Sequence, residues 1–398
     1  MTKSKDSITV FHFARWYPHR FDPMYGLFIQ RHAEAAALYG QMGVVYAHAA
    51  TENQEVNRQE IDYQLECDVH TVRIYYAPSK CKWAALRQLT NLMKFYKACF
   101  VGKKLLQNKI GRPDVIHIHI LSRLGLIGLY YKWLHHTPYV ISEHWSRYLP
   151  TGNYGGFLRK IFTRIVVRNS SGVTTVTNNL AKAMQQGRGL IGTNYEVLPN
   201  VVDPVFFKAP LVNKSDQKIK NLIHVSCFED KSKNISGLLR AVTAIAKIRS
   251  DFKTVLVGEG QDLDRMKQYA KELQIPEKQL TFTGLLTGDS LVEQMNSADF
   301  LLVTSHYENL PVVIIESFVL GVPVISTRVG GIAEVIDSQN GVLVEPGNEK
   351  ELILQITNCL DGKLSFDSNQ IMKQSHNTYT PEAVGIRLRE LYNKAIHA

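Results

Sequence analysis

Short apolar runs alternate with amphipathic stretches along the first half of the chain. The apolar runs predict strands at residues 8–14, 43–47, 69–76, 114–120, 139–142 and 172–177. The stretches between them place apolar residues at helical spacing and predict helices at residues 28–39, 83–108, 124–135 and 157–168. Strands that alternate with helices in this way predict a parallel sheet with helices on both faces.

The second half repeats the alternation. Its predicted strands lie at residues 222–226, 254–257, 280–282, 300–303, 322–325 and 341–344, and its predicted helices at 235–248, 263–273, 290–296, 312–320 and 381–396. The segment between the two series, residues 197–204, contains Pro199 and Pro204 and suits a hinge. The pattern therefore predicts an α/β protein made of two Rossmann-like, doubly wound domains.

Two carboxylates, Glu308 and Glu316, stand eight residues apart on either side of Pro311. Proline favours the first turn of a helix, because the N–H group that it lacks would be unpaired there anyway. Glu308 is therefore expected in the loop before a helix, and Glu316 inside that helix among Val, Ile and Phe, where a charge needs a partner. The free N–H groups of a first helical turn bind anions. Together these features favour binding of a sugar nucleotide.

Residues 298–336 resemble the E-x7-E signature of the retaining glycosyltransferases of family 4, which have the GT-B fold. A buried strand precedes Glu308, the run Gly321-Val322-Pro323 follows the helix, and Gly330-Gly331 forms the next turn, in the order typical of that family. The resemblance implies two domains that face a deep inter-domain cleft.

The domain boundaries follow from the hinge and the resemblance together. We predict an acceptor-binding domain at residues 1–199, a nucleotide-sugar-binding domain at 200–376, and a helix at 377–398 that crosses back to the first domain. Asn200 and Asp203 match the family's P-N-x-x-D pattern at the junction.

The resemblance also assigns candidate catalytic residues. Glu308 is expected to contact the transferred sugar, Lys233 the diphosphate, and His144 the donor sugar. Cys227 stands where the family has an arginine, so one phosphate-binding cation is missing. Lys231 or an arginine of the first domain is a possible substitute.

The other donor contacts are expected from Glu316, which would accept hydrogen bonds from ribose hydroxyls, and from backbone positions. Glycines let a backbone approach phosphate closely. The candidate backbone positions are Gly26, Asn309, Leu310, Gly330 and Gly331. No acidic D-x-D motif lies near a predicted strand end, so we expect neither a metal nor a cofactor besides the donor.

Acceptor contacts are expected from loops of the first domain that follow strands, where open α/β sheets bind ligands. The candidates are His119, Trp16, Tyr17 and Arg147, with Arg20 and Tyr148 nearby.

The net charge of +10 is concentrated in the first half, where 25 Lys and Arg face 12 Asp and Glu. The stretch from Lys80 to Arg112 holds nine basic residues and no acid, interleaved with apolar side chains such as Trp83 and Leu86. One interpretation is an ordinary surface helix with one solvated face. We favour a helix that lies on an anionic membrane surface, since each basic residue there contributes about 1 kcal/mol. No motif indicates a nucleic acid as partner.

The remaining features set the expected compartment. No apolar run approaches the roughly 18 residues of a membrane span, and no secretory signal is recognisable. The five cysteines are scattered without a C-x-x-C pair, which favours the reducing cytosol over a disulfide framework or a zinc site. We expect a cytoplasmic protein, peripheral on the inner membrane face.

These observations together with the family resemblance predict a metal-independent glycosyltransferase of hexosyltransferase type, and the resemblance implies that it retains the configuration of the sugar. It would move a sugar from a UDP- or GDP-sugar to a lipid-linked or growing bacterial surface glycan, such as capsule, O-antigen or exopolysaccharide. One alternative is a sugar-nucleotide epimerase of the same fold, which would need a small closed acceptor site. The other is a non-catalytic partner that binds sugar nucleotides, an interpretation that Cys227 favours. The sequence does not name the base, the sugar, the linkage or the acceptor.

Overall fold

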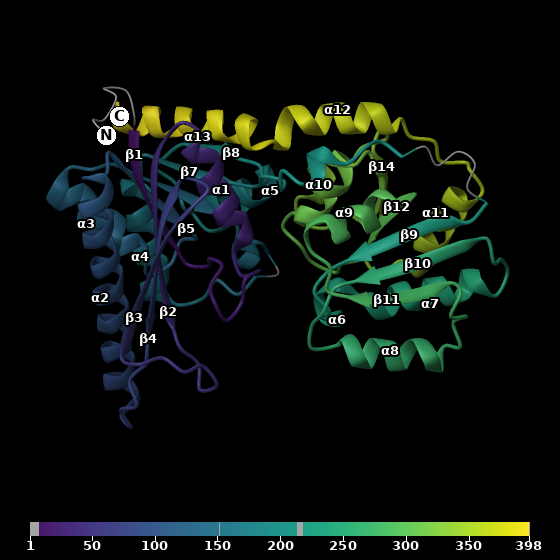
Figure 1. Cartoon of the computed structure of the whole chain (residues 1–398), viewed down its shortest axis with the longest axis horizontal. Coiled ribbons are helices and arrows are strands. Elements are labelled where there is room, and N and C mark those ends of the chain that lie inside the picture. The colour runs from purple at the N-terminus through teal and green to yellow at the C-terminus, as the bar shows by residue number, and fades with distance from the viewer. Residues whose placement is uncertain (1–7, 151, 213–217, 398) are drawn as a thin grey trace. The chain divides into compact units, whose positions relative to one another are not determined.

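The computed structural model describes residues 8–150, 152–212 and 218–397. They form two compact units, which we treat separately (Figure 1). Unit 1 contains the described residues of 1–176, 181–201 and 381–398, and unit 2 contains those of 177–180 and 202–380. No helix in the described part of the chain combines the length and apolarity that a membrane span requires.

Unit 1 is built on a sheet with the strand order β3-β4-β2-β1-β5-β6-β7-β8. The strands are β1 (Ile8–Ala14), β2 (Gly40–Ala49), β3 (Gln59–Glu66), β4 (Val69–Tyr76), β5 (Val115–His119), β6 (Tyr139–Glu143), β7 (Gly172–Thr175) and β8 (Tyr195–Val197). All neighbouring strands are parallel except β3, which pairs antiparallel with β4 at one edge. The chain therefore adds strands outward from β1 in both directions.

Helices cover both faces of this sheet. They are α1 (Leu27–Ala37), α2 (Ala84–Ile110), α3 (Gly125–His135), α4 (Phe157–Asn169) and α13 (Pro381–Ile396). Successive residues of β2 point to opposite faces of the sheet, as a pleated strand requires. Val44 belongs to the core cluster that includes residues of α1 and α13. Gly43 faces the other way, where a Cβ atom would lie 2.8 Å from Leu106 of α2.

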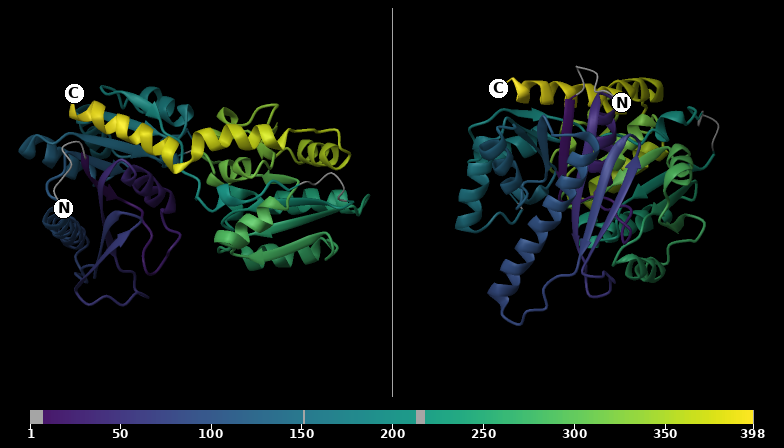
Figure 2. Two further views of the ribbon diagram at one scale, coloured as in Figure 1. Left: turned by 45° about the horizontal axis from the view of Figure 1, so that its top comes forward. Right: turned by 60° about the vertical axis from the view of Figure 1, so that its left-hand side comes forward.

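Helix α13 completes one face of unit 1, although the chain reaches it only after unit 2. Its buried side chains include Val384, Leu388 and Tyr392, which join the core of β1, β2 and α1. Gly385 allows the close approach to α1, because a Cβ atom there would lie 2.3 Å from the carbonyl oxygen of Ala35. The yellow α13 lies beside the purple α1 in the left view of Figure 2.

Unit 2 has a fully parallel sheet with the strand order β11-β10-β9-β12-β13-β14. The strands are β9 (Lys220–Val225), β10 (Phe252–Val257), β11 (Leu280–Gly284), β12 (Phe300–Val303), β13 (Val324–Thr327) and β14 (Gly341–Val344). The helices are α6 (Asp230–Lys233), α7 (Ile235–Ala246), α8 (Leu263–Glu272), α9 (Gly288–Asn296), α10 (Val312–Val319), α11 (Glu349–Leu360) and α12 (Ser368–Tyr379). Leu302 of β12 packs in the cluster of α7 and α11, whereas Leu301 and Val303 pack with α9 and α10.

Most predicted strands and helices occur with ends shifted by a few residues. The strand predicted at 322–325 is β13, which begins two residues later, because Pro323 has no N–H to give to the ladder. Strands β3 and β8, helices α11 and α12, and the short helices α5 (Asn178–Lys182) and α6 were not predicted. β3 is an edge strand whose residues are only partly buried, so its hydrophobic alternation is weak.

Candidate functional site

The candidate donor site lies at the carboxyl ends of the strands of unit 2. β9 stands between β10 and β12, so the strand order reverses its direction there. Open α/β sheets bind ligands beside such a reversal, where the loops after neighbouring strands diverge. The loop after β9 leads to Lys233, and the loop after β12 carries Glu308.

Lys233 and Glu308 form an ion pair across these two loops. Lys233 Nζ donates a hydrogen bond to Glu308 Oε1, and Ser305 Oγ donates to the same oxygen at 3.1 Å. Burial alone would lower the pKa of Lys233, but the charge and hydrogen bond of Glu308 outweigh it and raise the pKa. The two side chains are 18% and 15% exposed, so the pair is sheltered but within reach of a ligand.

Backbone contacts fix the positions of these loops. Thr304 Oγ1 donates to the carbonyl oxygen of Lys233 at 2.9 Å, and the N–H of His306 donates to the carbonyl oxygen of Ser232 at 2.8 Å. Asn234 adopts φ 53°, a left-handed conformation that lets α6 end and α7 begin without an intervening loop. Lys233 is therefore held at a defined corner.

The second glutamate of the pattern lies where the sequence predicts it. Pro311 directly precedes the first residue of α10, and Glu316 follows on the second turn, 8% exposed. Asn309 and Leu310, just before the helix, are each also 8% exposed. The loop therefore delivers Glu308 and the start of α10 to one edge of the sheet.

Gly330 and Gly331 lie directly on the Glu308 loop. Gly330 has φ +55°, and a Cβ atom there would lie 1.9 Å from the carbonyl oxygen of Glu308. The N–H of Gly331 donates to the carbonyl oxygen of Asn309 at 2.8 Å. No larger residue fits at Gly330, since both its backbone angle and its neighbour forbid a side chain.

Sequence reasoning missed two supports of this loop. Thr177 Oγ1 donates to Asn309 Oδ1 at 3.0 Å and accepts from the N–H of Leu180, as an N-cap residue does. Glu334 accepts hydrogen bonds from the N–H groups of Asn178 and Asn179 at 2.7 and 2.5 Å. The threonine followed by a short helix was the available signal for Thr177.

Cys227, at the position where the family has an arginine, lies after β9 with an exposed thiol. Lys231, a possible substitute cation, is exposed on α6. Neither side chain forms a hydrogen bond within the described ranges 8–150, 152–212 and 218–397.

Unit 1 holds a cluster of histidines that come from β1, α1, β5 and the loop after β6. The cluster consists of His12, His32, His117, His119 and His144. His12 Nδ1 lies 2.9 Å from His119 Nε2, and the two nitrogens of His117 lie 2.8 Å from Tyr392 Oη and 2.7 Å from Ser142 Oγ. Burial lowers the pKa of His12 to about 3 and, together with neighbouring histidines, lowers the pKa of His117 and His119 well below its usual value. These rings are therefore neutral near pH 7.

The same nitrogens have the spacing of metal ligands in two overlapping groups. Those of His12, His117 and His119 lie within 4.8 Å of one another, as do those of His32, His119 and His144. Hydrogen bonds already use both nitrogens of His117 and connect His12 with His119. The first group is thus explained as a buried hydrogen-bond network.

His144 and Gly26 border this cluster. The ring of His144 is partly exposed and lies 4.6 Å from that of Phe28 and 5.4 Å from that of His32. Gly26 caps α1 with φ +72°, and a Cβ atom there would lie 2.5 Å from the carbonyl carbon of Trp16. Gly26 therefore lets the loop after β1 pass close to α1. The roles of His144 and Gly26 toward a donor stay predictions.

Glu143 organises the loops after β5 and β6. It is fully buried, and its two oxygens accept hydrogen bonds from the N–H groups of Leu121, His144 and Trp145 at 2.8, 3.0 and 2.9 Å. Burial raises the pKa of Glu143 to about 7, although the three backbone donors act against the rise. Its carboxylate fixes the position of His144.

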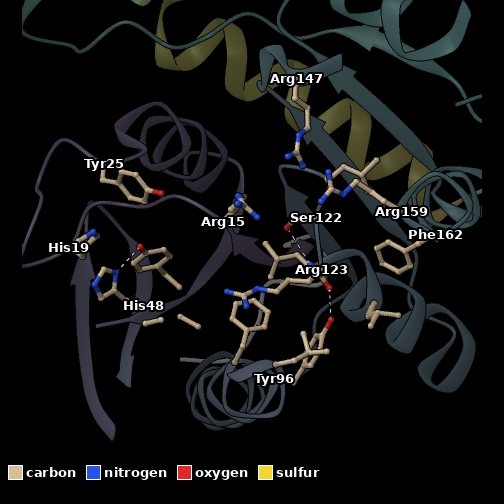
Figure 3. A pocket seen from close by; sticks show the side chains of 18 of the residues that line it. Arg15, His19, Tyr25, His48, Tyr96, Ser122, Arg123, Arg147, Arg159 and Phe162 are labelled. Carbon is tan, nitrogen blue, oxygen red and sulfur yellow. Dashed lines mark hydrogen bonds between the residues drawn. The ribbon is translucent and has the colours of Figure 1, made fainter. Parts of the chain in front are cut away.

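The residues predicted to contact an acceptor separate into two sets. Arg147 lines a pocket of unit 1 with a volume of about 1040 Å3 (Figure 3). Trp16, Tyr17 and His119 do not line this pocket. Tyr17 and His119 are fully buried, and Trp16 packs edge-on against Trp145 with 5.4 Å between the rings. Arg159 was noted from the sequence only as part of a basic cluster, and Arg15 and Arg123 were not singled out.

Known proteins share this sequence pattern and fold. The sequence profile "Glycosyltransferase Family 4" matches residues 41–206, and "Glycosyl transferases group 1" matches residues 207–377. The chain is 25% identical over 309 residues to 2-deoxystreptamine glucosyltransferase of Streptomyces kanamyceticus, which covers 73% of this chain and 79% of that protein. It is 24% identical over 302 residues to TuaC of Bacillus subtilis, whose name assigns it to teichuronic acid biosynthesis. That match covers 74% of this chain and 72% of TuaC.

Two solved structures show the likeness in fold. Sucrose-phosphate synthase from Thermosynechococcus elongatus matches with a TM-score of 0.75 at 17% identity, over 97% of this chain and 98% of that chain. Anabaena HepE in complex with UDP matches with a TM-score of 0.68 at 17% identity, over 97% and 99%. Both confirm the predicted pair of Rossmann-like domains. Since the two family profiles together reach from residue 41 to residue 377, the chain belongs to the family 4 glycosyltransferases of the GT-B fold.

Proposed function

We propose that this protein transfers a hexosyl group, with retention and without a metal, from a nucleotide-diphosphate sugar to a lipid-linked or growing bacterial surface glycan. The observation that carries the proposal is the pairing of Lys233 with Glu308 at the carboxyl edge of the unit 2 sheet. Glu316 and the Gly330-Gly331 turn lie on the loops and helix of the same edge. A cation, two carboxylates and a close backbone suit a sugar linked to a diphosphate.

Each residue has a distinct part in this proposal. The ammonium of Lys233 pairs with diphosphate oxygens, and its hydrogen bond to Glu308 is exchanged for that contact when the donor binds. Glu316 accepts hydrogen bonds from the ribose hydroxyls. The first-turn N–H groups of α10 face the negative charge that the leaving diphosphate develops, because a helix N-terminus favours anions.

The proposed reaction proceeds on one face of the sugar. The bond between the anomeric carbon and the diphosphate oxygen breaks, and the acceptor oxygen bonds to the anomeric carbon from the same side. The acceptor's proton passes to the departing phosphate oxygen. Glu308 stabilises the positive charge that develops on the sugar and forms no covalent bond. Fixed donors, rather than a metal, stabilise the leaving group.

Similar proteins support the nature of the substrates. HepE was solved with UDP and with UDP-glucose, which favours a UDP-sugar over a GDP-sugar as the first donor to test. The teichuronic acid relative supports a polymer of the cell surface as the product.

The surface of α2 supports a peripheral membrane location on the inner face. Trp83, just before the helix, is 79% exposed, and Leu86, Leu89 and Met93 are 53%, 54% and 64% exposed. The nine basic residues from Lys80 to Arg112 accompany these apolar side chains. Exposed apolar residues beside Lys and Arg are typical of helices that lie on anionic lipid.

A thermal-shift panel of nucleotide sugars tests the donor. A ligand that binds only the folded protein stabilises it in proportion to the logarithm of its concentration over its dissociation constant. We expect one UDP- or GDP-sugar to raise the melting temperature, with or without EDTA, and the Lys233→Ala variant to lose most of that rise. No response to any sugar nucleotide would contradict the proposal, and a response abolished by EDTA would contradict its metal-independent form.

Product analysis separates the alternatives. An epimerase converts the donor with no acceptor present, whereas a transferase leaves the sugar configuration unchanged and at most hydrolyses the donor. A non-catalytic partner binds the nucleotide sugar but neither hydrolyses nor transfers it. Donor turnover that is lost in Glu308→Ala, with the melting temperature retained, supports the transferase.

A further inference from the structure

Four arginines line the pocket of unit 1: Arg15, Arg123, Arg147 and Arg159. They come from four segments, namely the loops after β1, β5 and β6 and helix α4. In Figure 3 the guanidinium groups of Arg15, Arg147 and Arg159 point toward the same part of the pocket. Asp22 is the one carboxylate among the described lining residues. The pocket is therefore strongly positive.

The positive charges are not neutralised from within. Within the described ranges, none of the four arginines forms a salt bridge. The buried Nε atoms of Arg15 and Arg147 have no hydrogen-bond partner there. Glu143, the nearest buried carboxylate along the chain, accepts three backbone N–H groups, and its charge acts on Arg15 and Arg147 without a direct ion pair.

Like charges are held close together in this pocket. Burial, followed by the charges of Arg123 and Arg147, lowers the pKa of Arg15. Burial likewise lowers the pKa of Arg147, and Arg159 adds to that effect. Such repulsion costs free energy, and an anion placed among the guanidinium groups would offset it.

Aromatic rings hold the guanidinium groups without neutralising them. The guanidinium of Arg147 lies 3.5 Å from the ring centre of Trp145, and that of Arg15 lies 4.8 Å from the same ring. Arg123 lies 3.5 Å from the ring centre of Phe95 and also shares a hydrogen bond with the side chain of Tyr76. Cation–π contacts of this kind orient a guanidinium and do not use its N–H groups, which can bind oxygen.

The rest of the lining is largely apolar. Leu92 and Phe95 come from α2, and Leu158 and Phe162 from α4. The same two helices expose further apolar side chains outside the pocket, such as Met93 at 64% and Phe157 at 77%. A ligand with an anionic group and an apolar or sugar portion would match both parts of the lining.

We propose that this pocket binds the phosphate or diphosphate group of the acceptor substrate, an inference that rests on the glycosyltransferase function above. Arg15, Arg123 and Arg147 bind the phosphate oxygens, with Arg159 at the side of α4. Arginine suits this role because its planar fork of N–H groups matches phosphate in a bidentate fashion. The apolar wall of α2 and α4 accommodates the part of the acceptor attached to the phosphate.

Tryptophan fluorescence provides a direct binding assay. All four tryptophans belong to unit 1, and Trp145 contacts two of the pocket arginines. The probes are inorganic pyrophosphate, farnesyl diphosphate and octyl glucoside, which separate the charge from the apolar chain. The titrations use the Lys233→Ala protein as background, so that diphosphate binding at the candidate donor site of unit 2 does not contribute.

We expect both diphosphates to quench the fluorescence saturably and octyl glucoside to have no effect. Arg15→Gln and Arg147→Gln should each weaken diphosphate binding by about tenfold or more, the scale of a hydrogen bond between charged groups. Arg168→Gln is the matched control, because it removes the same charge from an exposed position of α4 that does not line the pocket. It should change the dissociation constant less than about twofold. Unchanged melting temperatures show that the variants fold.

Comparison of the probes also identifies the kind of acceptor that carries the phosphate. Tighter binding of farnesyl diphosphate than of pyrophosphate assigns the site to a lipid-linked acceptor, and equal binding assigns it to a water-soluble phosphorylated one. Octyl glucoside binding as tightly as the diphosphates would overturn the proposal, as would wild-type affinity in both arginine variants. Nucleotide-sugar stabilisation, measured separately, should persist in these variants. Its absence in the wild-type protein would refute the proposed function while leaving the phosphate site standing.

Discussion

The ammonium group of Lys233 is hydrogen bonded to the carboxylate of Glu308, so the cation predicted to bind the donor diphosphate already has a partner in the ligand-free protein. Lys233 ends the short helix α6 after β9, and Glu308 lies in the loop after β12, the neighbouring strand of the sheet. Under the proposed function, donor binding therefore involves an exchange of partners. The carboxylate restrains the lysine in a usable position, but the diphosphate has to compete with it.

This competition predicts opposite effects on binding and turnover for Glu308→Gln. Loss of the carboxylate charge frees Lys233, so UDP should bind as tightly as to the wild type or a few-fold more tightly. Sugar transfer should fall by about a hundredfold or more, the loss typical when one charged group that stabilises a transition state is removed. Calorimetric titration with UDP and a radiolabelled transfer assay measure the two effects. Weaker UDP binding in Glu308→Gln would contradict the partner exchange.

Lys233→Ala should weaken UDP binding by about tenfold or more, because a charge-assisted hydrogen bond to phosphate is lost. Lys267→Ala is the matched control, since it removes the same charge from an exposed position of α8 in the same unit, where no donor contact is proposed. Calorimetric titration of both variants is the measurement. If the two variants lose affinity equally, the effect is one of general charge, and the pairing with Glu308 carries no special role.

Gly330→Ala should destabilise the candidate donor site by more than the strain of its left-handed backbone conformation alone. Alanine in a left-handed conformation costs about 1–2 kcal/mol, and its methyl group would also meet the Glu308 carbonyl oxygen. Gly347→Ala is the control, because Gly347 has φ +78° and a Cβ atom there would meet no other atom within 4 Å. We expect Gly330→Ala to lower both the melting temperature and UDP affinity, and Gly347→Ala to lower the melting temperature only slightly. Equal effects would show that the close contact is unimportant.

The histidine cluster predicts that unit 1 loses stability in mild acid. Burial lowers the pKa of His12 to about 3 and that of His32 to about 4, whereas unfolded histidine titrates near 6.5. Below about pH 6.5 the histidines of the unfolded chain become protonated, whereas those of the native cluster stay neutral. The free energy of unfolding therefore falls as the pH falls. Each such histidine contributes about 1.4 kcal/mol per pH unit. Glu143, whose pKa is raised to about 7, acts in the opposite direction but is one group against five.

Tryptophan fluorescence reports this transition, since all four tryptophans belong to unit 1. We expect denaturant midpoints followed by fluorescence to decrease steeply between pH 6.5 and about 5. Circular dichroism, which follows both units, should show a shallower change. A fluorescence midpoint that is constant over this range would mean that the cluster is already charged in the native protein.

Binding of α2 to lipid predicts a dependence on specific lysines. Lys97 and Lys104 are exposed one heptad apart on this helix. The double variant Lys97→Gln/Lys104→Gln should weaken binding to vesicles that contain anionic lipid by about tenfold or more, at about 1 kcal/mol for each charge. The double variant Lys267→Gln/Lys271→Gln removes the same charge from exposed positions of α8 in unit 2 and should bind as the wild type does. Co-sedimentation with vesicles measures both. Equal losses, or binding that added salt does not weaken, would contradict the prediction.

The positions of the candidate donor residues could be predicted because most of them lie close together in the sequence. Glu308, Pro311 and Glu316 belong to one strand–loop–helix unit, so local rules for helix starts place all three. Lys233 lies in the short helix α6 after another strand, and only the family resemblance connected it with Glu308. Its contact depends on β9 and β12 being neighbours, which hydrophobic periodicity does not reveal.

The arginine pocket shows the opposite case. Arg15, Arg123, Arg147 and Arg159 come from four separate segments, and only Arg147 among them was predicted from the sequence to contact an acceptor. Their convergence follows from the position of β1 between β2 and β5, a property of strand order. Tyr17 was predicted to be an acceptor contact because it lies beside Trp16 in a loop, yet its ring is fully buried. Proximity in sequence gives no information on which way a loop side chain points.

Helix α13 has a consequence for how the protein is made. The apolar surface of α1 and the neighbouring strands is covered only by residues that the ribosome adds after the whole of unit 2. During translation the apolar surface of unit 1 that α13 covers therefore stays exposed while unit 2 is synthesised and can fold. Nascent unit 1 is thus a natural client for chaperones, and its completion is a late, post-synthetic docking step.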